Sequence, residues 1–114
     1  MKWYIAKIVF RIVCGDGTHR PQFDEQLRLI AAADREEAFQ KACDLGKAED
    51  ETFYNQYGQP VHWEFINVPE VYRFALTEGT ELYSQIQEVD NAETYIELAH
   101  AKAERMSRKA KLTM

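Results

Sequence analysis

Histidines and cysteines are the side chains most able to bind a metal or attack a substrate, and this chain has three of the first and two of the second. His19, His62 and His100 stand at no metal-ligand spacing from one another or from a cysteine, so no metal site is predicted. Cys14 and Cys43 match no zinc or redox motif. They are expected either as two buried thiols or as a disulfide. Because the N-terminal residues lack an export signal, the sequence favours buried thiols.

Other catalytic patterns are equally weak. The five glycines form no phosphate-binding loop, and the serines lie in no nucleophile elbow. Asp24 and Glu25 have the residue types of an acid–base pair, but they are adjacent in a predicted strand, where neighbouring side chains point to opposite faces. The sequence therefore supplies no catalytic residue, implies no cofactor and favours a non-enzymatic protein.

Charge is distributed unevenly along the chain. Residues 101–114 hold five basic residues and one acidic residue, a net of +4, which leaves −9 for residues 1–100 out of the total of −5. An acidic body repels nucleic acid, and cations near the end of a helix also complement its dipole, so nucleic-acid binding is not expected. The basic segment could instead contact an acidic partner, including the body of a second copy.

Length and composition suit one domain. The chain has 114 residues, of which 46% are hydrophobic, and no apolar run approaches the ~20 residues that cross a bilayer. We therefore predict a single domain over residues 1–114, with a core at 2–100 and a basic helix end at 101–114. No membrane segment is predicted, and a cytoplasmic location is expected.

Two strands are predicted near the N-terminus. Residues 2–14 alternate between two faces, and one of these faces is apolar throughout: Tyr4, Ala6, Ile8, Phe10, Ile12 and Cys14. Residues 23–32 form the second strand, joined to the first as a hairpin. Its apolar residues Phe23, Leu27 and Leu29 are predicted to join the core, with Gln26 and Arg28 on the opposite face.

Later segments complete the predicted fold. Asp34 and Glu37 have capping-box spacing and begin a helix that Gly46 is expected to end. A second capping box at 90–93 begins a longer helix, to about residue 109. Strands are predicted in this order: a hairpin of 53–57 with 61–66, and a strand at 81–86, while 69–78 fits a short strand or a helical turn. The order β-β-α-β-β-β-α predicts an α+β fold with an antiparallel sheet of about five strands and helices mainly on one face.

The sheet face away from the helices is the strongest candidate site. It is predicted to mix apolar, aromatic and charged side chains: Trp3, Ile5, Lys7, Val9, Arg11, Gln26, Arg28, His62, Glu64 and Tyr83. Such a mixture is typical of an interface or a shallow ligand site, and the candidate binding residues are Arg11, Arg28, Glu64 and Tyr83. Salt-bridged cross-strand packing is the alternative explanation.

The last helix offers a second candidate interface. Tyr95, Ile96, Ala99, Ala103 and Met106 fall on one apolar stripe. A helix of ~19 residues is roughly 28 Å long and exceeds a typical strand, so its distal turns are expected to need a partner. Trp3, Tyr95, Ala99 and Met106 are the predicted interface residues, and self-association, most simply as a dimer, is expected.

Five blocks of the sequence resemble the bacterial domain of unknown function 4288 family. They occur in order and are KWYIAKIVFRI, FDEQLRLI, EEAFQKACDLGKAED, VHWEFINV and GTELYSQIQE, within about residues 2–88. The resemblance implies a small bacterial cytoplasmic protein whose activity has not been assigned, and it supplies no catalytic residues.

Three functions remain open. The first is a non-enzymatic interaction protein that acts as a homo-oligomer or with a protein partner. The second is a toxin-neutralising immunity or antitoxin protein, because an acidic body suits the masking of a basic nuclease. The third is a small-ligand binder or enzyme with its site on the outer sheet face.

Overall fold

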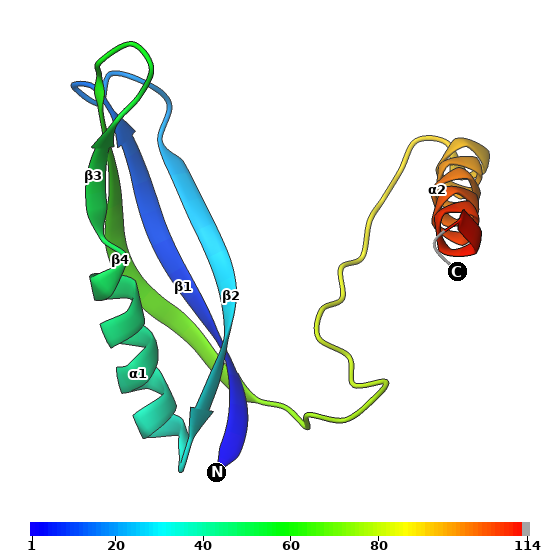
Figure 1. Cartoon of the computed structure of the whole chain (residues 1–114), viewed down its shortest axis with the longest axis horizontal. Helices are drawn as coiled ribbons and strands as arrows, with labels where there is room; N and C mark the ends of the chain where they lie inside the picture. The colour runs from blue at the N-terminus through cyan, green and yellow to red at the C-terminus, as the bar shows by residue number, and fades with distance from the viewer. Residues whose placement is uncertain (113–114) are drawn as a thin grey trace. The chain divides into compact units, whose positions relative to one another are not determined.

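The computed structural model describes residues 1–112 and confirms the α+β class. Its elements, in order, are β1 (Lys2–Cys14), β2 (Gln22–Ala32), α1 (Arg35–Ala48), β3 (Glu51–Tyr54), β4 (Pro60–Arg73) and α2 (Ala92–Leu112) (Figure 1). The chain forms two compact units: residues 1–82 contain the sheet and α1, and the second unit begins at Tyr83 and contains α2. This boundary falls inside the predicted core of residues 2–100.

The sheet has four strands rather than about five. They are antiparallel, in the order β2-β1-β4-β3, and the predicted hairpins β1–β2 and β3–β4 are confirmed. The predicted strand at 81–86 is absent, and residues 74–91 as a whole form neither helix nor strand. Of the ambiguous stretch 69–78, residues 74–78 form neither helix nor strand, and residues 69–73 are strand, as the end of β4. Proline is tolerated there because β3 pairs only with residues 60–63, which leaves that side of β4 as a sheet edge.

α1 covers one face of this sheet, which we call the inner face (Figure 1). Its start is the predicted capping box: the Glu37 amide donates to Asp34 at 2.8 Å, and the Ala33 amide donates to the Glu37 carboxylate at 3.2 Å. The small residues Ala38 and Ala42 are fully buried against the sheet. The helix thus lies close to the strands, as its composition predicted.

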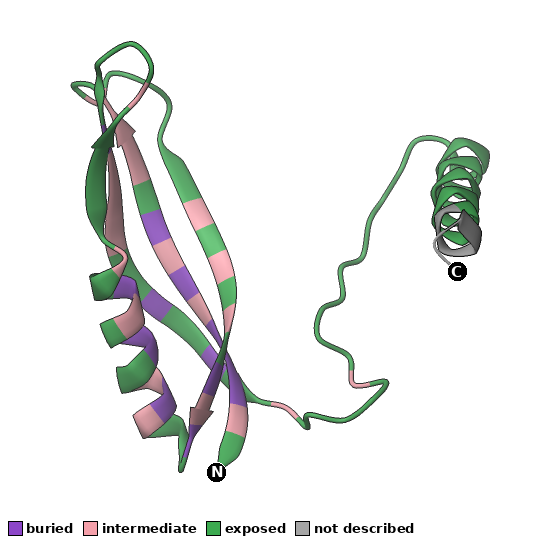
Figure 2. Cartoon of the chain, in the orientation of Figure 1, coloured by how far each residue is buried: buried purple, intermediate pink, exposed green. Residues whose placement is uncertain are grey.

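The core lies between α1 and the inner face. Ile8 and Phe10 are essentially inaccessible to solvent, and Phe65 packs edge-on against Phe10 with ring centroids 6.1 Å apart. Figure 2 shows the buried residues alternating along β1 and following the sheet-facing side of α1. The predicted core face of β1 is therefore confirmed from Tyr4 to Phe10, whereas Ile12 is half-buried.

The prediction that Gly46 ends α1 is wrong. The helix continues to Ala48, and Gly46 is buried within it. A Cβ at this position would lie 2.4 Å from ring carbons of Phe65 and 3.1 Å from Ile8 Cγ2. Glycine is therefore required for the close approach of helix and sheet and has no role in stopping the helix.

The predicted orientation of β2 is also wrong. Phe23, Leu27 and Leu29 are 56%, 41% and 52% exposed, and the register places all three on the face away from α1. Gln26 and Arg28 pair with β1 residues of the inner face instead. A strand alternates with period two, so an error of one residue exchanges its faces completely.

The second unit consists of a connecting segment and α2. Asn91 caps this helix by accepting from the Thr94 amide at 3.0 Å, one residue after the predicted start of the capping box. α2 carries the predicted interface residues Tyr95, Ala99 and Met106, all exposed, and residues 83–112 hold no other helix or strand. Of the basic segment 101–114, residues 113–114 and the side chains of residues 109–112 lie outside the described part of the chain.

Neither helix within residues 1–112 is long and apolar enough to cross a membrane. The prediction that the helices lie mainly on one face of the sheet is answered here for α1 alone, because α2 belongs to the second unit.

Candidate interaction surface

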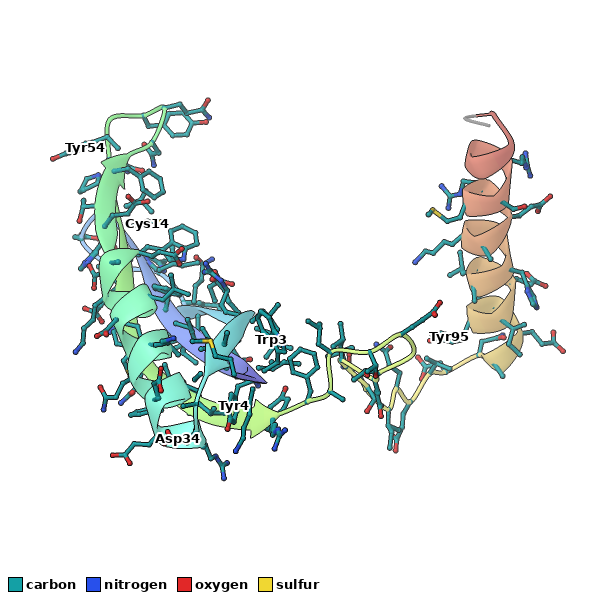
Figure 3. The ribbon with its side chains drawn as sticks, turned by 60° about the horizontal axis from the view of Figure 1, so that its bottom comes forward. Trp3, Tyr4, Cys14, Asp34, Tyr54 and Tyr95 are labelled. Atoms are coloured by element: carbon teal, nitrogen blue, oxygen red, sulfur yellow. The ribbon has the colours of Figure 1, made fainter. Side chains whose placement is uncertain are left out.

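The sheet face opposite α1, which we call the outer face, has no helix of its own unit over it. The strand registers assign it these side chains: Trp3, Ile5, Lys7, Val9 and Arg11 of β1, Phe23, Glu25, Leu27 and Leu29 of β2, and His62, Glu64, Glu70 and Tyr72 of β4. Trp3 and Cys14 mark the two ends of β1 in Figure 3. The surface is therefore mixed, as predicted, but three of its four β2 side chains are apolar.

A row of charges crosses the middle of the outer face. Lys7 Nζ lies 2.8 Å from a Glu70 carboxylate oxygen on β4 and 3.7 Å from one of Glu25 on β2. The hydrogen bond to Glu70 is the main reason why the pKa of Lys7 is raised. Exposed pairs of this kind contribute little to stability. Salt-bridged cross-strand packing therefore explains the charged side chains of this row. It does not explain the apolar side chains of the outer face.

An apolar groove lies beyond this row. The segment that follows β4 leaves the sheet with the Phe74 amide donating to the Trp3 carbonyl at 3.2 Å. It forms a groove of about 230 Å³ lined by Ile5, Leu27, Arg28, Leu29, Phe74, Leu76 and Leu82. Ligand pockets usually measure ~300–1,000 Å³, so the groove suits a single apolar side chain better than a whole ligand.

Two of the four predicted binding residues are neighbours. Arg11 and Glu64 are register partners on the outer face. Arg28 lies on the inner face, and Tyr83 is the first residue of the second unit and belongs to no strand. His62 hydrogen-bonds Asp50 at 2.8 Å. That bond, with the Phe65 amide, lowers the pKa of Asp50. The binding roles of the four residues stay predictions.

A polar ladder on the inner face occupies the sheet beyond the C-terminal end of α1. Arg28 donates to both oxygens of Glu49 at 2.7 and 3.0 Å and to Gln26 at 3.0 Å. Gln26 and the Trp63 indole in turn donate to Asp24 at 2.7 and 3.3 Å. The hydrogen bonds between Arg28 and Glu49 raise the pKa of the first and lower that of the second.

Sequence reasoning missed this ladder. Asp24, Gln26 and Arg28 recur every second residue, which could have indicated one polar face of β2. Glu49 carried no signal, because its role depends on where α1 ends relative to the sheet.

A second hollow of about 450 Å³ lies beside the ladder. It is lined by Phe10, Gln26, Ala48, Glu49, Glu51, Phe53 and Trp63. Phe53 and Trp63 stack there with ring centroids 6.0 Å apart. No group of three histidine, cysteine or acidic side chains within residues 1–112 could hold a metal ion.

The cysteines are free thiols. Cys43 is buried, as predicted, and burial raises the pKa of its thiol, whereas Cys14 is half-buried at the end of β1. A raised thiol pKa disfavours the reactive thiolate, so the structure gives Cys43 a packing role.

Fold and surface together define a small α+β protein in which a helix covers one sheet face and leaves an apolar groove on the other. The chain belongs to the family described as Domain of unknown function (DUF4288), whose family model matches residues 3–84. The match includes the sheet, α1 and the groove-forming segment, but not α2. No curated protein and no solved structure matches the chain.

Proposed function

We propose that this protein is a small interaction protein that acts through self-association, with apolar side chains of its outer face at the contact. One observation carries the proposal: Phe23, Leu27 and Leu29 stand half-exposed on a regular strand of the sheet face that α1 leaves uncovered. Exposed apolar side chains gathered on one face of a folded protein mark protein contacts.

The size of the face supports this. Thirteen residues of β1 at ~3.3 Å each extend for roughly 43 Å, and three long strands ~4.8 Å apart span about 14 Å, or about 600 Å² before side-chain relief is counted. A standard interface buries ~800 Å² on each partner. The outer face thus approaches the area of a standard interface, whereas its groove is small for a ligand. Free cysteines suit a reducing compartment, and we propose that the protein acts in the cytoplasm.

The test is the mass in solution, measured by light scattering over a wide dilution series. We expect the parent protein to exceed the 13.3 kDa of one chain at micromolar concentrations. Leu29→Glu should shift the mass towards the monomer, because it places a charge within the apolar part of the outer face. Tyr57→Glu, at an exposed position in the β3–β4 turn, is the matched control and should leave the mass unchanged. A monomeric parent protein at every concentration and salt would end the proposal.

A further inference from the structure

The two edges of the sheet differ in regularity. β3 at one edge has only four residues, and the part of β4 beyond it contains a proline and two register irregularities. β2 at the other edge has eleven residues, pairs with β1 without interruption from Gln22 to Ala32 and contains no proline. Within residues 1–112 no strand pairs with the other side of β2. A long, regular edge strand is a template for pairing with another chain.

Two hydrogen bonds show which backbone groups face this edge. The Trp3 carbonyl accepts from Phe74 on the β4 side, so Trp3 and its register partner Ala31 exchange no hydrogen bonds. The Ala31 carbonyl accordingly accepts from Lys41 Nζ at 2.8 Å. Because the register is regular, the groups of residues 23, 25, 27 and 29 also point away from β1. Lys41 covers the end of the edge at Ala31. The N–H and C=O groups of residues 23, 25, 27 and 29, eight in all, remain available for pairing.

We propose that β2 pairs antiparallel with β2 of a second copy, centred on Gln26, to make one continuous eight-stranded sheet. The inference rests on the proposed self-association and places its contact along β2, where the apolar side chains of the two outer faces meet side by side. In this register residues 23 and 25 lie opposite 29 and 27 of the second copy. The two-fold axis repeats these two pairs, and each of the resulting four pairs exchanges two hydrogen bonds. All eight edge groups of each copy are then satisfied.

Charge selects this register among those that the backbone allows. Asp24 faces Arg28 of the second copy, and the two-fold axis makes that pair twice. Registers centred on residue 24, 25 or 28 instead place Asp24, Glu25 or Arg28 opposite its own copy, and like charges directly opposite are unfavourable. A register centred on Leu27 sets two carboxylates against apolar residues, Asp24 against Ile30 and Glu25 against Leu29, whereas the Gln26-centred register sets only Glu25 against one, Leu27. Opposite charges therefore face each other in the Gln26-centred register alone of these five.

The side chains retain the capacity for these contacts. The Arg28 guanidinium carries five N–H donors, and its contacts within the described chain are to Gln26 and Glu49. Gln26 and Trp63 both donate to Oδ2 of Asp24, which leaves Oδ1 for a further donor. On the opposite face, Phe23 would lie beside Leu29 of the second copy. The apolar outer faces of the two copies would then form one surface across the axis.

Charge complementation tests the pairing. Asp24→Arg puts two arginines opposite each other at each pair, and Arg28→Asp puts two carboxylates there, so each variant alone should self-associate at least about tenfold more weakly. An equimolar mixture of the two variants matches opposite charges at both pairs and should restore the dimer. Glu51→Arg makes the same change in charge at the β3 edge and should leave the mass unchanged.

Asp24 and Arg28 also contact Trp63 and Glu49, so circular dichroism must show that both variants fold. Glu25→Pro provides a second test, because it removes an N–H that points to the edge and costs no bond to β1. It should give a folded monomer. If the parent protein is dimeric but neither the single variants nor Glu25→Pro weaken it, or if the mixture does not restore the dimer, the edge pairing is wrong while self-association stands. A monomeric parent protein overturns both.

Discussion

The two faces of the sheet are made by the same strands and have opposite environments. On the inner face, Ile8 and Phe10 have lost almost all contact with solvent beneath α1. On the outer face, Leu27 and Leu29 remain about half-exposed. Burial of apolar area is the main favourable term in folding, so the inner face should hold most of the stability of this unit. Apolar side chains that folding leaves exposed are available for association.

The largest expected effect is on the inner face. Phe10→Ala removes a fully buried ring that contacts Phe65, and should lower the free energy of unfolding by about 3–5 kcal/mol. Denaturant melts measure this directly. A loss of less than about 1 kcal/mol would show that Phe10 does not belong to the core that stabilises the fold.

An added methyl group at the helix–sheet contact should have the next largest effect. Gly46→Ala favours the helix intrinsically, yet its Cβ would overlap the Phe65 ring. Overpacking typically costs about 1–3 kcal/mol, so a net loss of stability is expected. The double variant with Phe65→Leu should show a smaller effect of the alanine, because the ring that obstructs it is gone. A more stable Gly46→Ala protein would contradict the close approach.

Leu29→Ala provides the matching measurement on the outer face. Because half of this side chain is already in solvent, its truncation should cost less than about 1 kcal/mol, measured at a concentration where the protein is monomeric. A loss as large as that for Phe10→Ala would remove the distinction between the faces.

Acid should weaken the contacts between the sheet and the C-terminal end of α1. The pKa of Glu49 is lowered by Arg28, and that of Asp50 by His62 and the Phe65 amide. A lowered carboxyl pKa contributes stability that is present above the ordinary value of ~4 and is lost as pH falls through the folded value. The unfolding free energy should therefore decline in that acid range. Arg28→Met should flatten the decline by a small amount, under about 1 kcal/mol, because both partners are partly exposed.

The sequence predicted the local features best. The strand at 2–14, both hairpins and the capping box of α1 depend on neighbouring residues and are confirmed. The orientation of β2 depended on whether α1 covers its apolar or its polar residues. The polar residues lie on the side of α1, beyond the end of the helix, where Arg28 contacts Glu49. Gly46 and residues 81–86 were misassigned for a similar reason, since local patterns do not reveal the approach of a distant ring or the absence of a pairing strand.

Residue-resolved amide hydrogen exchange along β2, at a high and a low protein concentration, tests the account most directly. The even-numbered amides from 24 to 28 point to β1 and should be protected at both concentrations. The odd-numbered amides from 23 to 29 point to the free edge and should be protected only at high concentration, when a second copy is paired there. Odd-numbered amides that exchange at the same rate at both concentrations, while the mass of the protein changes, would contradict association through this edge.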